Sequence, residues 1–158
     1  METMIRQDID SARSLFPPRA FLDLHLGKAE CKTFKETVAA NRDALYDFSR
    51  AWVRSSIIKL LHPKDWKERL KNKREVRVKD EIATSLNLTL SKVEFVDKTA
   101  SSLGSSIDSC TGLKGSEIRR YRAIYDATIL NGQGTLTLDA EVMNVAGKGW
   151  LVVGYRHE

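Results

Sequence analysis

Apolar residues recur at helical spacing through the first half of the chain. Thr33 and Glu36 have the spacing of a capping box, which predicts that a helix begins at Thr33. The side chains that follow form one apolar stripe, and His62-Pro63 ends it: Phe34, Val38, Leu45, Phe48, Trp52, Ile57 and Leu60 or Leu61. The pattern predicts one long helix of about 28 residues, or about 40 Å.

Shorter helices are expected on both sides of this long helix. Residues 5–16 keep helical spacing until Pro17-Pro18 ends them, and residues 21–26 fit either a strand or a turn of helix. Residues 64–71 can form another short helix after Pro63. Apolar positions up to residue 87 indicate a third, basic helix: Val78, Ile82 and Leu86.

From residue 88 the apolar period changes to two, which is typical of strands. Residues 88–90 and 93–95 alternate, with Ser91 and Lys92 out of step as in a β-bulge. Residues 100–115 are rich in Ser, Gly and Thr and predict a long loop, with room for a short strand around Ile107.

Two long alternating segments, 118–130 and 136–145, flank Asn131-Gly132, the strongest two-residue hairpin signal. With that turn, Tyr125 faces Leu138 and Arg122 faces Glu141. A turn at Gly132-Gln133 would set Asp126 opposite Asp139, and like charges directly opposite are unfavourable. The first register is therefore predicted. A last strand, 150–155, is expected to place Val153, Tyr155 and Arg156 opposite Val142, Ala140 and Asp139.

These elements predict an α+β fold, in which N-terminal helices, including the long one, pack on a curved antiparallel sheet of about four strands. A chain of 158 residues is expected to form a single domain. Residues 1–33 would be a helical or irregular extension, 34–87 the helical half and 88–158 the sheet half.

Composition supports a folded chain, with 42% apolar and 30% charged residues. No apolar run approaches the roughly 20 residues that span a bilayer, and the N-terminus lacks a signal pattern. The default expectation is a soluble cytoplasmic protein; a trimmed secreted or anchored domain would look the same. Cys31 and Cys110 have no ligand spacing, so two reduced thiols are favoured, while a disulfide joining the two halves stays open.

Positive charge is concentrated in residues 50–80, which hold eleven basic and four acidic side chains. The net charge of this segment therefore exceeds the net charge of the whole chain, which is +5. This segment is the first candidate site, a patch for phosphates or anionic headgroups. The residues predicted to form this anion-binding patch are Arg54, Lys59, Lys64, Lys67, Lys71, Lys73, Arg74 and Arg77. The favoured interpretation is a solvated helix surface, and no nucleic-acid motif is present.

The predicted sheet offers two further candidates. Its polar face carries Arg120, Arg122, Asp126, Asp139, Glu141 and Arg156. An exposed face with cross-strand ion pairs is favoured there; inside a cone, Asp126 and Asp139 would be the acid–base candidates. On the apolar side, Tyr121, Tyr125, Tyr155 and Trp52 could line a ligand pocket, although core packing is favoured. No metal site and no cofactor is expected.

The closing segment Gly149-Trp150-Leu151-Val152-Val153-Gly154-Tyr155 resembles the last strand of many NTF2-like proteins. With the order of elements over residues 34–158, the chain is similar to the cystatin-like α+β roll of that superfamily. The resemblance implies a cone-shaped half-barrel wrapped on a helix, and frequent dimers. The enzymes of the superfamily use a Tyr/Asp or His/Asp constellation that has no counterpart here, so no catalytic residue is carried over.

Three functions remain open from the sequence. The first is a non-catalytic module that binds a protein partner or a second copy of itself. The second is an anion-binding protein whose residues 50–80 contact nucleic acid or a membrane surface. The third is a small-molecule enzyme or carrier that uses the cone interior.

Overall fold

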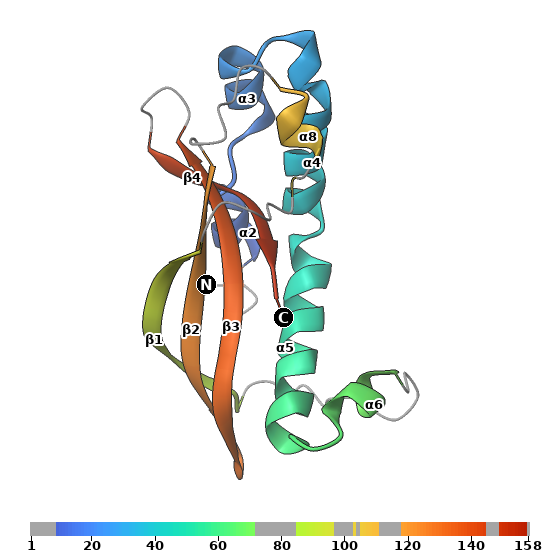
Figure 1. The fold of residues 1–158 in the computed structure, drawn as a ribbon, viewed down its shortest axis with the longest axis vertical. Helices are drawn as coiled ribbons and strands as arrows, with labels where there is room; N and C mark the ends of the chain where they lie inside the picture. Colours follow the sequence, from blue (N-terminus) through green and yellow to red (C-terminus); the bar gives the residue numbers. More distant parts are fainter. Residues whose placement is uncertain are drawn as a thin grey trace.

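The structure, a computed structural model, describes residues 9–71, 85–96, 103, 105–110, 118–144 and 149–157. N-terminal helices pack on a four-stranded antiparallel sheet whose strands lie in the order β1-β2-β3-β4. Figure 1 shows the sheet curving beside the two longest helices, with β1 at the edge away from them. The predicted α+β class and strand number are confirmed.

Among the described residues, six helical segments precede the sheet: α2 (Ile9–Ser14), α3 (Arg19–His25), the 3-10 turn η1 (Ala29–Cys31), α4 (Lys32–Asp43), α5 (Leu45–Leu61) and α6 (Trp66–Lys71). The ambiguous residues 21–26 therefore lie mostly in a helix. The predicted single helix is interrupted at Ala44, which separates α4 from α5. The capping box was wrong: η1 runs directly into α4, and Cys31 caps the helix without a side-chain hydrogen bond.

The strands are β1 (Asn87–Val96), β2 (Ile118–Ile129), β3 (Gly132–Asn144) and β4 (Trp150–Arg156). The β-bulge in β1 is confirmed, because the pairing with β2 shifts between Leu90 and Lys92. The strand expected around Ile107 was wrong, since a short helix, α8 (Ser105–Asp108), occupies that place. The predicted third basic helix falls mainly on residues 72–84, outside the described residues.

The β2–β3 register differs from both alternatives weighed for it. Ile129 pairs with Gly132, so the turn is Leu130-Asn131, and Leu130 adopts a left-handed φ of 48°. Gly132 belongs to the strand because it lies against the end of α5. A Cβ there would stand 2.7 Å from the Leu60 carbonyl oxygen. A long-range contact thus overrides the local hairpin preference for Asn-Gly in the turn.

This register changes the partners across the sheet. Arg122 lies opposite Asp139, not Glu141 as predicted, and Tyr125 lies opposite Leu136. On the other side of β3, the expected pairs of Ala140 with Tyr155 and Asp139 with Arg156 are confirmed. Val142 faces Val152 and not Val153, because the β3–β4 pairing shifts after Glu141.

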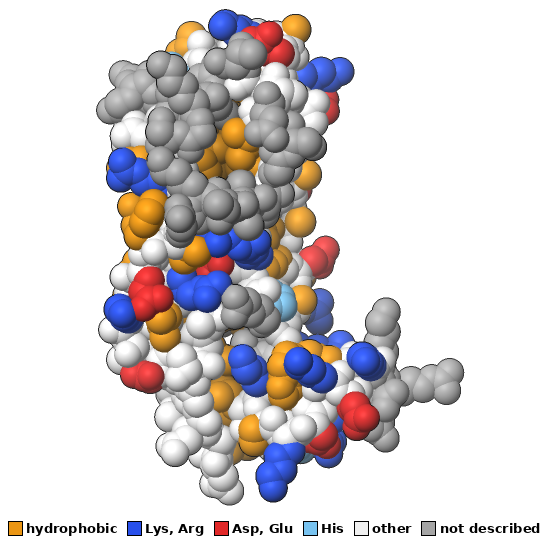
Figure 2. Space-filling model, in the orientation of Figure 1, with side chains coloured by type: hydrophobic (Ala, Val, Ile, Leu, Met, Phe, Trp, Pro, Cys, Tyr) orange, Lys and Arg blue, Asp and Glu red, His pale blue; other side chains and the backbone are white. Residues whose placement is uncertain are grey.

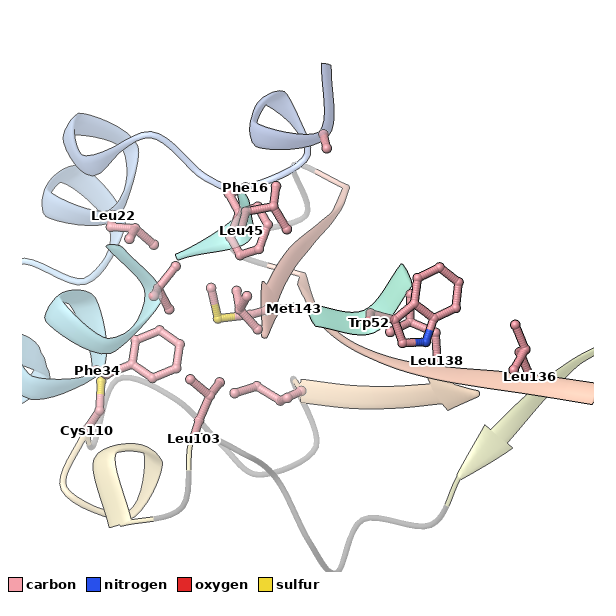
Figure 3. Close-up of a cluster of buried hydrophobic side chains, with 14 of the residues drawn as sticks. Phe16, Leu22, Phe34, Leu45, Trp52, Leu103, Cys110, Leu136, Leu138 and Met143 are labelled. Carbon is pink, nitrogen blue, oxygen red and sulfur yellow. The ribbon is translucent and has the colours of Figure 1, made fainter. Parts of the chain in front are cut away.

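The hydrophobic core extends along both long helices (Figure 3). Trp52 of α5 lies toward Leu136 and Leu138 of β3 at one end of the cluster, and Phe34 of α4 lies with Leu22 at the other. The predicted apolar stripe is buried except for half-buried Phe48 and Leu61. The core therefore uses the stripe that the sequence predicts.

A disulfide joins Cys31 to Cys110, and both residues are buried. The expectation of two reduced thiols was wrong. The bond connects the start of α4 to the connection between β1 and β2, across 79 residues of sequence. Spacing along the chain could not show that η1 and the end of α8 meet.

The β4 edge of the sheet is covered by the N-terminal half of the chain. The Val152 backbone N–H donates to the Leu15 carbonyl at 2.9 Å. The Asn41 side-chain amide donates to the Val153 carbonyl at 2.9 Å, and the Tyr155 hydroxyl donates to the Asn41 carbonyl. Leu15, directly after α2, and Asn41 of α4 thus bind two backbone groups of this edge, the Val152 N–H and the Val153 carbonyl.

Candidate functional site

The β1 edge differs from the β4 edge in its apolar exposure. Three large apolar side chains of β1 reach the surface together: Leu90 (53% exposed), Val93 (55%) and Phe95 (55%). Within the part of the chain that the structure describes, β1 has β2 as its one strand neighbour. An edge strand of this kind presents unpaired backbone groups that another strand can bind. We call Leu90, Val93, Phe95 and the outer backbone of residues 91–95 the β1 surface.

The bulge at Ser91 places these three side chains on one face. Leu90 lies opposite Tyr125, whereas Val93 and Phe95 lie opposite Ala123 and Tyr121. Tyr125 and Ala123 are buried on the side of the sheet that faces α5, so the β1 side chains extend the same apolar face. Helix α5 contacts β2 and β3, and it leaves the β1 part of that face open.

Aromatic packing fixes the far end of the β1 surface. The Phe95 and Tyr121 rings meet edge to face with centroids 5.7 Å apart. Such a pair contributes about 0.5–1.5 kcal/mol beyond its buried area. The contact with Tyr121 therefore orients the Phe95 ring, while more than half of the Phe95 side chain remains exposed to solvent. An exposed ring with a fixed orientation is suited to docking a partner.

The polar face of the sheet holds a compact charge cluster centred on Asp139. Arg122 binds its carboxylate through two nitrogens at 2.8 and 3.1 Å, and Arg156 and Arg120 approach it to 3.5 and 3.8 Å. The favoured interpretation was an exposed face with cross-strand ion pairs. The ion pairs are observed, but the carboxylates at the centre of this face are not exposed. Asp139 is 3% exposed and Glu141 is 1% exposed.

The two acid–base candidates lie apart. Asp126 is exposed and pairs with Thr89 and Thr135. Asp139 sits opposite Arg122, four residues along β2 from Asp126, a separation of about 13 Å at the rise of a strand. Asp139 accepts hydrogen bonds from Arg122 of β2 and forms an ion pair with Arg156 of β4, so this arrangement fastens β2, β3 and β4 together. We see in it a structural role, since its carboxylate is already occupied.

The aromatic pocket candidates do not share a pocket. Tyr125 packs edge to face on Trp52 with centroids 6.4 Å apart, and Tyr155 packs on Phe48 at 4.1 Å. Tyr121 packs on Phe95, as above. Burial raises the pKa of Tyr125 to about 12, and burial with the nearby Asp47 charge raises that of Tyr155 to about 12. The three tyrosine rings therefore belong to three different packed pairs, one of which includes Trp52.

A small cavity lies between Trp52, Trp66 and β3. It is lined by Trp52, Ser55, Ser56, Lys59, Trp66, Leu136 and Thr137, and its volume is about 10 Å³. A space of that size has room for about one water molecule. It is too small for the substrate of an enzyme or the cargo of a carrier.

The basic segment is described as far as Lys71. Lys59 and Lys67 place their ammonium groups 5.6 and 5.5 Å from the centre of the Trp66 ring. Lys64 and Lys71 are exposed, whereas Arg54 is half-buried. Figure 2 shows basic side chains around the hydrophobic surface of this region. Lys73, Arg74 and Arg77 lie outside the described residues.

Sequence reasoning missed the β1 surface. The alternation of residues 88–90 and 93–95 predicted a strand with one apolar face, and the usual inference is that such a face is buried. An additional signal was available: this strand is the first of the sheet and its polar positions include Lys92 and Glu94, a pattern of edge strands.

Comparison of the chain with protein-family models, curated proteins and solved structures gave no match. The resemblance to NTF2-like proteins thus stays a prediction. Among the described residues, no helix is long and apolar enough to cross a membrane. The same residues contain no group of three or more side chains placed to hold a metal ion.

Proposed function

We propose that this protein is a non-catalytic interaction module that docks a protein partner on the β1 surface. One observation carries the proposal: three large apolar side chains lie exposed together on one face of an edge strand. Backbone groups along such an edge supply affinity for an added strand, and the side chains beside it supply specificity.

The polar groups of the sheet support the non-catalytic part of this proposal. Asp139 is surrounded by Arg120, Arg122 and Arg156, and the distant Asp126 is solvated. General acid–base work needs a group free to exchange protons with a bound substrate. Saturable turnover that is lost in Asp126→Asn or Asp139→Asn, with folding intact, would overturn this part.

Docking on β1 can be tested by comparing captured proteins. We expect immobilised wild-type protein to retain a partner from an extract of its source cells, and Phe95→Asp to lose it. Leu24→Asp is the matched control, because Leu24 of α3 is 78% exposed and lies outside the β1 surface. Retention of the same partners by Phe95→Asp and wild type would contradict the proposal.

A second candidate function is anion binding by the surface of α5 and α6. The specific observation is Trp66, whose ring lies close to both Lys59 and Lys67 and could stack on a base or enter an interface. Binding to a nucleic acid or anionic vesicle would have to weaken steeply with salt. Charge reversal of Lys64, Lys67, Lys71 and Lys73 should abolish it, and equal binding by that variant would rule it out.

The disulfide bears on where the protein works. Disulfides persist in oxidising compartments and are rare where glutathione keeps thiols reduced. We therefore propose an oxidising compartment in place of the cytoplasmic default, on the basis of the Cys31–Cys110 bond. Protein isolated from its source without reductant, then unfolded in denaturant so that both buried cysteines become accessible, should resist alkylation at both positions; alkylation of both cysteines under these conditions would argue for the cytoplasm.

A further inference from the structure

We propose that the partner docked on the β1 surface is a second copy of this chain, paired antiparallel through residues 91–95 about a two-fold axis at Val93. The inference rests on the proposed docking role of β1. The proposal specifies one register of the two β1 strands, because the charge pattern of β1 favours that register.

The charge pattern of β1 is self-complementary in that register. With Val93 opposite Val93 of the second copy, Lys92 of each copy faces Glu94 of the other. Moving the axis to Lys92 would set two lysines directly opposite each other, and moving it to Glu94 would do the same with two glutamates. Like charges directly opposite destabilise a sheet, whereas opposite charges stabilise it. The neighbouring two-fold registers are thereby disfavoured.

Lys92 and Glu94 already form an ion pair within one strand. Their nitrogen and oxygen atoms are 2.6 Å apart, and their side chains are 65% and 39% exposed. In the dimer, the two pairs would lie next to each other with alternating sign. Both charges are on the polar face and exposed, so each keeps access to water and pairing costs little desolvation.

The apolar face is continuous across the same axis. A two-fold axis perpendicular to a sheet keeps the same face of both copies on the same side. Val93 of the two copies would meet at the centre, with Phe95 of each on the flanks. The apolar face that α5 covers over β2 and β3 would thereby extend across both β1 strands, joining the two four-stranded sheets into one of eight.

The small size of the contact is typical of weak, transient associations. Five residues of each strand, with Val93 and Phe95 of each copy on the apolar face, make a contact at the lower end of specific interfaces, below about 1,200 Å². We therefore expect a reversible dimer with a dissociation constant on the order of micromolar. The dimer should therefore appear and disappear over the concentration range of a sedimentation experiment.

Charge exchange tests the register. Sedimentation equilibrium of the full chain should show a monomer–dimer equilibrium. Lys92→Glu and Glu94→Lys should each weaken it about tenfold, since each creates two like-charged pairs per dimer. Combining both substitutions should restore the wild-type constant to within about threefold. Lys64→Glu, an exposed charge on another surface, is the control and should leave the equilibrium unchanged.

Cysteine crosslinking tests the axis. Residues directly opposite in antiparallel strands have Cα atoms about 4.5–5.5 Å apart, within the range of a disulfide. Val93→Cys should therefore form a covalent dimer under mild oxidation, because the native cysteines are already bonded to each other. Leu90→Cys, on the same face and equally exposed, is the control and should not crosslink.

The outcomes separate this inference from the proposed function. A monomer at every concentration, a swap that fails to restore dimerisation, or equal crosslinking at positions 90 and 93 would overturn self-pairing. If the wild type is monomeric and Phe95→Asp still removes a captured partner, docking on β1 stands and the partner is another protein. If it is monomeric and no captured partner depends on Phe95, both proposals fail.

Discussion

The two edges of the sheet carry similar apolar strands and are treated in opposite ways. At β4, the Val152 N–H donates to the Leu15 carbonyl and the Val153 carbonyl accepts from the Asn41 side chain. The Tyr155 ring packs against Phe16 and Phe48. At β1, apolar side chains of comparable size remain open. The difference shows that apolar alternation predicts a strand with one apolar face. Whether other segments of the same chain bury that face depends on the rest of the fold.

The largest expected effect is at the covered edge. Phe16 is buried and meets Tyr155 edge to face at 5.9 Å. Phe16→Ala should lower the free energy of unfolding by about 4 kcal/mol, because it removes a full aromatic side chain and leaves a cavity beside β4. Chemical denaturation would measure this. A cost below about 1 kcal/mol would mean that α2 and its following residues do not hold this edge.

The disulfide should have the next largest effect. Replacing both cysteines, Cys31→Ser with Cys110→Ser, should cost about 3 kcal/mol, because the bridge closes a long loop and restricts the unfolded chain. It also anchors the connection that leaves the open β1 edge to the start of α4. Denaturation with and without reductant measures the effect. Reductant should destabilise the wild type and leave the double variant unchanged; equal responses would refute a stabilising bond.

Local patterns were sufficient to predict most of the fold. The apolar stripe of α4 and α5, the change of period at residue 88 and the bulge beside Ser91 are all repeated in the structure. These features depend on neighbours within a few residues, so sequence spacing reports them directly. The arginine–carboxylate face was also foreseen, because alternation assigns its residues to one side of the sheet.

The features that were wrong or missed depend on contacts between distant segments. The turn lies at Leu130-Asn131 because Gly132 must fit against the Leu60 carbonyl, 72 residues earlier in the numbering. The disulfide depends on where α8 meets η1. The openness of Phe95 depends on which strands α5 reaches. Contacts of this kind, between distant segments, produce no periodic pattern of residues along the chain.

The hydroxyl of Tyr155 offers a smaller test at the covered edge. Tyr155→Phe removes its hydrogen bond to the Asn41 carbonyl and should cost about 1 kcal/mol. The pKa of Tyr155 is raised from 10.0 to about 12 in the folded protein. The folded state therefore holds this proton more tightly, so its stabilising contribution is complete below pH 10 and is lost as pH rises toward 12.

Denaturation curves between neutral and alkaline pH check this sign. Stability of the wild type should fall as pH rises through the interval between the two pKa values, and Tyr155→Phe should show a shallower fall. Tyr125, whose pKa burial raises to about 12, should account for part of the remainder. A variant with the same alkaline profile as the wild type would contradict the role given to Tyr155.

The smallest expected effect on the monomer is at the open edge, and it gives the sharpest comparison. Phe95→Ala removes the same side chain as Phe16→Ala, from a ring that is 55% exposed and packs on Tyr121. At low concentration, where monomer dominates, we expect a loss of about 0.5–1 kcal/mol. At high concentration the loss should grow, because a variant that dimerises less gains less stability from association. Unfolding at two protein concentrations measures both values. A loss that is large and independent of concentration would show that Phe95 belongs to the core of its own chain, and the contrast between the two edges would disappear.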